Sequence, residues 1–310
     1  MRLDYNLAVY ENNRVFVGCQ AVLTGTLSEY SHEIVGDDKW LSGLVFQYLS
    51  AGAGVLELEH PDPNRTTLEE EHKLHGAWQA YCAAEEREAA WLARWTFSNV
   101  LPSRRRGAMS RMGSPFYATI PDQDMRLAVV SIARGGDEPT FFARDIISKQ
   151  IKTPIPTLRA SCQRVDSSAQ IVLPEGISRA EEAYLPGLPY FEVPPVWLPR
   201  PTLEHSVKGT YNLTGRKLIA VEAADASGTT CAGLFPEVFL RCRSIPEELI
   251  LIFLNAHSVG IRYLQEEIAK VCDVPITIVV GMLHAGLDLH WYLRGPGMFD
   301  GGKMRHLTNG

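Results

Sequence analysis

The sequence lacks several features that would place it in a specialised class of protein. Its formal net charge is −6, which excludes a general electrostatic attraction to nucleic acid or to an anionic membrane. No uninterrupted apolar run is long enough to span a membrane, and the first residues contain no signal-peptide core. We therefore expect a soluble, cytoplasmic protein that does not associate with membranes.

Reactive and cofactor-binding motifs are also missing. The six cysteines are scattered without a C-x-x-C pair, which favours buried thiols in a reducing compartment over a disulfide framework. No nucleophile elbow of the G-x-S-x-G type occurs, and no cofactor is predicted. Hydrophobic residues make up 45% of the 310 residues and charged residues 21%, so the chain is long and apolar enough for one large or two smaller globular domains.

What is present is clearest between Arg216 and Val280. Continuous apolar runs at 217–222, 249–254 and 275–280 are typical of strands buried on both faces of a parallel sheet. Between the second and third runs, apolar residues recur at steps of three and four, as on one side of a helix: Ile261, Leu264, Ile268 and Val271. Strand, helix and strand form a right-handed βαβ unit, and we predict a mixed α/β fold with a mostly parallel sheet.

Residues 1–150 are predicted to form a β-rich region with one long helix. Segments 7–10 and 14–17 flank a polar turn and suggest a hairpin, and the alternation of 55–59 suggests another strand. The helix is expected over 67–99, because Thr67 and Glu70 have the spacing of a capping box. Its three tryptophans are interpreted as core or subunit-interface anchors: Trp78, Trp91 and Trp95.

Residues 151–210 are rich in proline and also contain large apolar side chains. Proline excludes long regular elements, so we predict an extended arm that lies in a groove of its own fold or of a neighbouring protein. Residues 211–310 are then the third region, an α/β Rossmann-like unit that contains the predicted βαβ motif.

Polar residues follow the three predicted strands of that unit. Glu222, Asn255, His257 and His284 are candidate catalytic residues, since ligands of open parallel sheets bind beyond the carboxyl ends of the strands. The alternative is that they cap or hydrogen-bond strand ends. His257, His284 and His290 could contribute to a metal site, but their spacing matches no established zinc signature, so no metal is predicted.

Positive charge is concentrated in one place, between Ser103 and Met112. A loop containing Arg104, Arg105, Arg106 and Arg111 could contact phosphate, and it is the possible route to nucleic-acid binding. The alternative is a solvated loop whose arginines pair with nearby acidic residues.

Two partial resemblances concern the region from residue 211 onward. Residues 217–230 resemble the strand and phosphate loop of thymidylate-kinase-like P-loop enzymes, with Ala223 in place of the first glycine and Thr229 in place of the lysine. Glu222 also resembles the strand-end glutamate of Toprim domains, which implies a Mg²⁺ site, but Asn255 and His257 replace the paired aspartates. Each resemblance implies a degenerate, inactive relative.

Two functions remain open at this point. Degenerate motifs, the tryptophan-bearing helix and the proline-rich arm favour a non-catalytic structural or assembly subunit that self-associates or binds protein partners. The alternative is an intracellular α/β enzyme that acts on a small phosphate-containing or nucleotide-like substrate at the carboxyl ends of the strands.

Overall fold

A computed structural model describes residues 1–24, 31–58, 68–133, 136–165, 200–287 and 291–294. Nine described strands form one sheet in the order β1-β2-β11-β10-β9-β6-β7-β8, with β3 paired to the second half of β2, residues 19–24. The strands are β1 (Arg2–Leu3), β2 (Arg14–Thr24), β3 (Ser31–Gly36), β6 (Leu127–Ile132), β7 (Thr157–Arg164), β8 (Leu203–Lys208), β9 (Lys217–Asp225), β10 (Glu248–His257) and β11 (Ile276–His284). Strands from all three sequence regions therefore join a single sheet.

The sheet is mostly parallel, as predicted. β2, β11, β10, β9, β6 and β7 are parallel neighbours, whereas β1, β3 and β8 run antiparallel at the two edges. β10, α6 (Ser258–Ala269) and β11 make the expected βαβ unit, and β9 is joined to β10 through α5 (Thr229–Cys242). The mixed α/β fold is confirmed.

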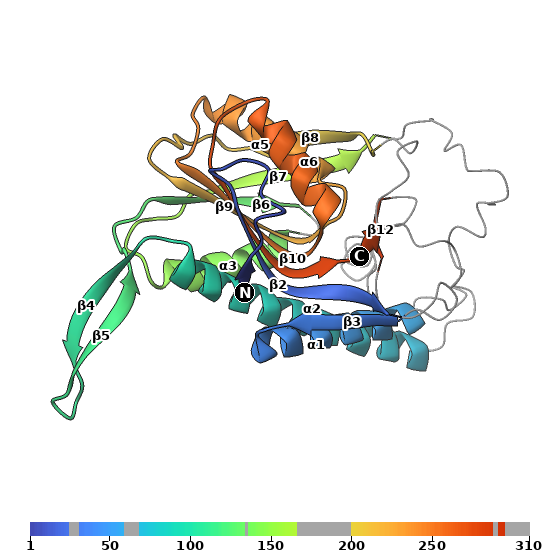
Figure 1. Cartoon of the computed structure of the whole chain (residues 1–310). Helices are drawn as coiled ribbons and strands as arrows, with labels where there is room; N and C mark the ends of the chain where they lie inside the picture. Colours follow the sequence, from blue (N-terminus) through green and yellow to red (C-terminus); the bar gives the residue numbers. More distant parts are fainter. Residues whose placement is uncertain (25–30, 59–67, 134–135, 166–199, 288–290, 295–310) are drawn as a thin grey trace.

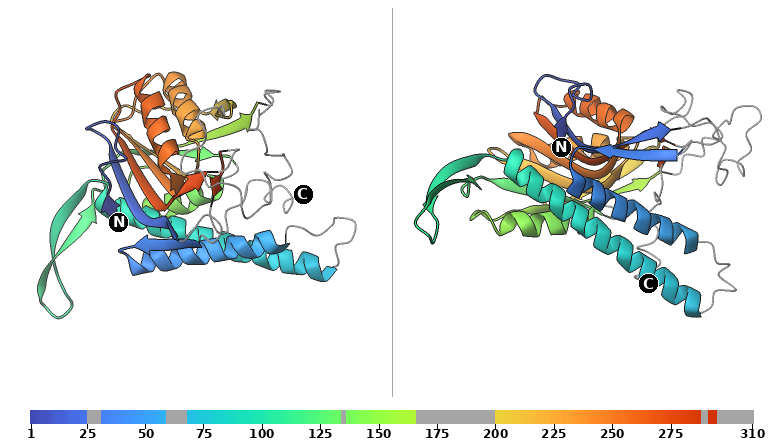
Figure 2. Two further views of the ribbon diagram at one scale, coloured as in Figure 1. Left: turned by 45° about the vertical axis from the view of Figure 1, so that its right-hand side comes forward. Right: turned by 60° about the horizontal axis from the view of Figure 1, so that its bottom comes forward.

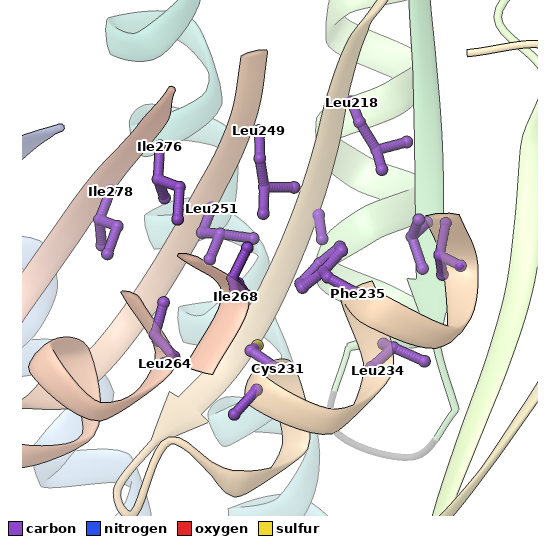
Figure 3. Close-up of a cluster of buried hydrophobic side chains, with 14 of the residues drawn as sticks. Leu218, Cys231, Leu234, Phe235, Leu249, Leu251, Leu264, Ile268, Ile276 and Ile278 are labelled. Carbon is purple, nitrogen blue, oxygen red and sulfur yellow. The ribbon is translucent and has the colours of Figure 1, made fainter. Parts of the chain in front are cut away.

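Helices cover both faces of the sheet, which gives three layers (Figures 1 and 2). On one face, α5 and α6 enclose a core in which Phe235, Leu251 and Ile268 are fully buried (Figure 3). On the other face lie α1 (Lys39–Leu58), α2 (Leu68–Asn99) and α3 (Asp137–Ser148). Burial of apolar side chains on both faces explains why the central strands are continuous apolar runs.

α2 confirms the predicted long helix, and its tryptophans pack against the chain's own core. Trp78 is 7% exposed, and Trp91 and Trp95 are partly buried against the α1–α3 side of the sheet. The Trp95 ring centroid lies 5.2 Å from that of Phe16.

α1 corrects the prediction of a strand at 55–59, because the helix continues through the glycine-containing stretch to Leu58. Asp38 caps it by accepting hydrogen bonds from the backbone N–H groups of Trp40 and Leu41 at 2.9 and 3.1 Å. Leu41, Val45 and Leu49 recur every four residues and are buried, so packing against α2 and the sheet outweighs the low helix propensity of the glycines.

The predicted hairpin of 7–10 with 14–17 is also wrong. β2 pairs instead with β1, and the side chain of Gln265 on α6 binds the intervening segment. Gln265 donates to the carbonyl of Leu7 at 2.9 Å and accepts from the N–H of Val9 at 3.1 Å. These bonds satisfy backbone groups that a hairpin ladder would otherwise have used.

The basic segment is a strand, not a loop. β4 (Ser103–Met109) pairs antiparallel with β5 (Pro115–Pro121), and this hairpin projects from the body of the molecule (Figures 1 and 2). Of the proline-rich region, the two ends form β7 and β8 of the main sheet. Residues 166–199, with most of its prolines, lie outside the described residues.

Candidate functional site

The sheet has one point where its connections diverge. β6 and β9 are adjacent and parallel, but β6 leads through α3 on one face to β7, whereas β9 leads through α5 on the opposite face to β10. The crevice outside the carboxyl ends of β6 and β9 is therefore a topological switch point, the place where open α/β sheets bind ligands.

Glu222 lies beside this crevice, although not at the strand end where the sequence placed it. β9 continues to Asp225, and Glu222 lies opposite Phe253 of β10. A Cβ atom on Gly136, the residue that precedes α3, would lie 2.9 Å from Oε2 of Glu222. The carboxylate therefore faces the start of α3, across the switch point.

Asp225 is the residue at the true end of β9, and it is only 4% exposed. It accepts a hydrogen bond from the backbone N–H of Gly228, whereas Oδ2 has no hydrogen-bond partner among the described residues. Burial raises the pKa of Asp225 to about 7, against the smaller opposing effects of the Gly228 N–H and the Arg200 charge. A buried carboxyl with an unpaired oxygen is costly to fold, so Asp225 is a candidate functional residue.

The turn between β9 and α5 has no room for a larger residue. Gly228 has φ +79, and a Cβ on it would overlap the carbonyl oxygen of Gly260 in the first turn of α6. A Cβ on Gly260 would in turn overlap the carbonyl oxygen of Ala226 and lie 3.0 Å from Oδ2 of Asp225. As N-cap, Gly228 offers no side chain to the first N–H groups of α5. Such a helix end attracts anions through its N–H groups and its dipole.

Arg200 supports the turn from the side of α6. Its Nε donates to the carbonyl of Ser227 at 3.2 Å, and its guanidinium carbon lies 3.8 Å from the ring centroid of Tyr263 and 4.6 Å from that of Trp291. Burial lowers the pKa of Arg200 from its ordinary high value. The arginine thus places a cation near Asp225 and anchors the turn.

Asn255, His257 and His284 are brought together, but each makes a hydrogen bond within the sheet or its adjoining helix. His284 Nε2 and Asn255 Oδ1 are 2.9 Å apart, and Asn255 Nδ2 donates to the carbonyl of Ala223 at 3.4 Å. His257 caps α6, since its Nδ1 accepts from the N–H of Val259 at 3.2 Å. These are the bonds expected of structural residues, so we centre the candidate site on Asp225 and the turn.

The arginine candidates lie apart from this site, on the β4–β5 hairpin. His290 lies outside the described residues, and within the described ranges no three His, Cys, Asp or Glu side chains are grouped to hold a metal ion. Arg104 on β4 pairs with Asp122 at 2.9 Å, which raises the pKa of Arg104 and lowers that of Asp122. Arg111 is exposed at the hairpin tip, and Arg105 and Arg106 belong to β4. No helix of the described chain is both long and apolar enough to cross a membrane.

No protein-family model and no curated protein matches this sequence. Solved structures show only a distant likeness. The AQ2163 protein from Aquifex aeolicus is 11% identical, with 81% of this chain and 88% of that chain covered and a TM-score of 0.47. The adenine phosphoribosyl transferase from Trypanosoma brucei is 10% identical over 99% and 100%, with a TM-score of 0.40. The purine phosphoribosyltransferase from Pyrococcus horikoshii Ot3 is 10% identical over 63% and 83%, with a TM-score of 0.31. Likeness at this level defines neither a family nor a function for this chain.

Sequence reasoning missed Asp225 and Arg200. The signal for Asp225 was available, because Ala223 and Ala224 extend the apolar run and the turn residues Ser227 and Gly228 mark where the strand ends. Arg200 gave no signal, since its role depends on two aromatic side chains more than sixty residues further along the chain.

Proposed function

We propose that this chain is an α/β enzyme that acts on a small phosphorylated ligand with hydroxyl groups, of the nucleotide or sugar-phosphate class. The ligand would bind in the crevice between β6 and β9. Its phosphate would lie at the N-terminus of α5, and a hydroxyl group would donate to Asp225 after a shift of the turn, because Oδ2 is closed off from solvent in this structure.

One observation carries the proposal. Asp225 is a buried carboxyl whose Oδ2 has no hydrogen-bond partner among the described residues, and it lies directly before a glycine turn that leads into the N-terminus of α5. There the N–H of Thr229 makes only a long hydrogen bond of 3.4 Å to Ser227 Oγ. The helix end favours the anion, and the carboxylate oxygen accepts a hydroxyl hydrogen, so the two groups match a ligand with both features. Ser227 and Thr229 hydrogen-bond each other through hydroxyl oxygens 2.8 Å apart, which leaves one hydroxyl hydrogen in the same turn for a ligand.

The enzyme is favoured over a purely structural subunit because Asp225 can exchange a proton near neutral pH. A general acid or base works best when its pKa is close to the operating pH, and Asp225 has a pKa of about 7. By contrast, burial and the neighbouring carboxylates of Asp225 and Glu222 raise the pKa of Cys231 far above its ordinary value, which makes a thiolate nucleophile unfavourable there.

The test is binding of a panel of nucleoside monophosphates and sugar phosphates, measured by calorimetry. Asp225→Asn should weaken binding of the ligand found by at least tenfold, since the amide cannot replace a carboxylate as acceptor of a charge-assisted bond. Asp37→Asn is the matched control, because Asp37 is exposed and far along the chain from the turn. Unchanged binding in Asp225→Asn, or no binding by any member of the panel, would count against the proposal.

A second candidate, the assembly subunit, keeps support from one feature. Trp40 and Phe46 on α1 are 77% and 63% exposed, so two large apolar side chains of this helix are available to contact a partner. Light scattering should then give a mass above that of one chain at micromolar concentration, and Trp40→Ser with Phe46→Ser should lower it. Tyr5→Ser, at a residue that is 79% exposed, is the control. A monodisperse single chain would dismiss this candidate.

A further inference from the structure

A concave region lies on the α3 face of the sheet, and none of residues 222–230 lines it. It is a pocket of about 300 Å³ bounded by the start of α3 and by β7 and β8. Its lining includes the side chains of Arg159 and Ser161 from β7, Ser206 and Lys208 from β8, and Phe141 from α3.

Two cations are placed opposite each other in this pocket. Arg159 and Lys208 are Cα partners in the β7–β8 ladder, and like charges at directly opposite positions destabilise a strand pair. Neither residue forms an ion pair or a side-chain hydrogen bond with any other part of the chain that the structure describes. The repulsion between them is therefore uncompensated by a direct partner.

The next outward-facing pair adds hydroxyl donors. Ser161 and Ser206 are partners two residues along the same ladder and point to the same face as the two cations, since side chains alternate along a strand. The acidic group at the pocket wall, Asp137, already accepts a hydrogen bond from Ser131. The lining therefore holds two cations and two hydroxyl groups against a single carboxylate.

We propose that this pocket binds a phosphate group of a small organic ligand. Arg159 and Lys208 would contact the anionic oxygens, and the hydroxyl groups of Ser161 and Ser206 would donate to the same group. Phosphate fits this donor set better than a carboxylate, because it carries three terminal oxygens and up to two charges. Phe141, which is 41% exposed, would pack against the organic part of the ligand.

The competing explanation is protection of a sheet edge. β8 ends the strand order, and exposed lysines on edge strands discourage pairing with another chain. That explanation accounts for Lys208 but not for Arg159 on the inner neighbour, nor for the two hydroxyls in register beside them.

The experiment is a calorimetric titration with inorganic pyrophosphate and with adenosine monophosphate at low ionic strength. Arg159→Gln with Lys208→Gln removes both charges, Ser161→Ala with Ser206→Ala removes both hydroxyls, and Lys152→Gln is a control at an exposed lysine outside the pocket. We expect binding that weakens at least tenfold in the charge variant, weakens less in the hydroxyl variant, and stays within twofold of the natural chain in the control. Raising the salt concentration should weaken it further.

Asp225→Asn separates this proposal from the proposed function, because it should leave binding in the pocket unchanged. Equal binding by the charge variant and the natural chain, or no binding of either probe by the natural chain, would overturn the proposal. Binding of single-stranded oligonucleotides without binding of either small probe would also overturn it, in favour of a nucleic-acid surface. Circular dichroism spectra and melting curves check that the variants fold. Without ligand, the charge variant should melt at or above the temperature of the natural chain because repulsion is relieved.

Discussion

Asp225→Asn should make the protein more stable at neutral and alkaline pH. Asparagine keeps the size of the side chain and an oxygen that can accept from the Gly228 N–H, but it carries no charge that must lose its hydration. The buried carboxylate destabilises the folded state only at pH values where Asp225 is ionised, so the stability gained by Asp225→Asn depends on pH.

The size of the effect follows from the pKa. Burial moves the pKa of Asp225 from 3.8 to about 7, which is roughly three pH units at about 1.4 kcal/mol each, or up to about 4 kcal/mol. Since the folded pKa is raised, the stability that this group contributes is fully present below about pH 4 and is lost as pH rises to about 7. The variant lacks this loss, so its advantage should grow across that window and stay constant above it.

Urea denaturation at intervals from pH 4 to pH 9 measures the difference directly. The free energy of unfolding of Asp225→Asn minus that of the natural chain should rise by up to about 4 kcal/mol with pH, whereas Asp37→Asn should show no such trend. Two parallel stability curves for Asp225→Asn and the natural chain would refute the reasoning. A variant that is more stable yet binds no ligand is the combination expected of a polar group retained for function.

Three further predictions test other parts of the core. Glu88 on α2 is buried against β11, and burial, with the nearby Glu85 as a lesser cause, raises its pKa well above the ordinary value. The natural chain should therefore lose about 1.4 kcal/mol of unfolding free energy per pH unit as the pH rises above about 4.5. Urea titrations of Glu88→Gln should show a smaller loss. Gly228→Ala should destabilise the protein by more than about 2 kcal/mol, because Gly228 has a positive φ and an added Cβ would overlap α6. Gly76 lies in open space on α2, so Gly76→Ala should stabilise the protein by about 0.5–1 kcal/mol. Thermal melts of both variants measure the two effects. Burial raises the pKa of Glu248, but hydrogen bonds from Lys217, Thr277 and Arg14 outweigh burial and hold the pKa below its usual range. Glu248→Gln should lower the free energy of unfolding by about 3 kcal/mol at pH 7 and by progressively less in acid. An equal loss at pH 3 and pH 7 would contradict this prediction.

The central sheet could be predicted because its signal is local. Each of the three apolar runs is complete within six residues. Because these strands are buried on both faces, polar and apolar residues do not alternate along them as they would along a surface strand. The helix at 68–99 was equally readable, since a capping box and a long periodic pattern agree. Both conclusions needed no knowledge of what lies across the sheet.

Other elements depend on contacts between distant parts of the chain, and these could not be predicted. The stretch around Gly52 and Gly54 has low helix propensity, and α1 forms there through packing against α2 and the sheet. The same holds for the site. That Asp225 is buried with Oδ2 unpaired depends on how closely Gly260 of α6 approaches the turn, which a pattern within β9 does not encode.

The position of β2 has a consequence for how the protein is made. β2 belongs to the first 24 residues, yet it pairs in parallel with β11, which begins only at Ile276. The ribosome therefore releases one side of this ladder long before the other exists, and until then β2 has unpaired backbone groups along that edge. Contacts that join such distant parts of a chain slow folding and leave apolar strands exposed during synthesis. A longer delay between translation of β2 and translation of β11 should accordingly raise chaperone demand and lower the yield of soluble protein.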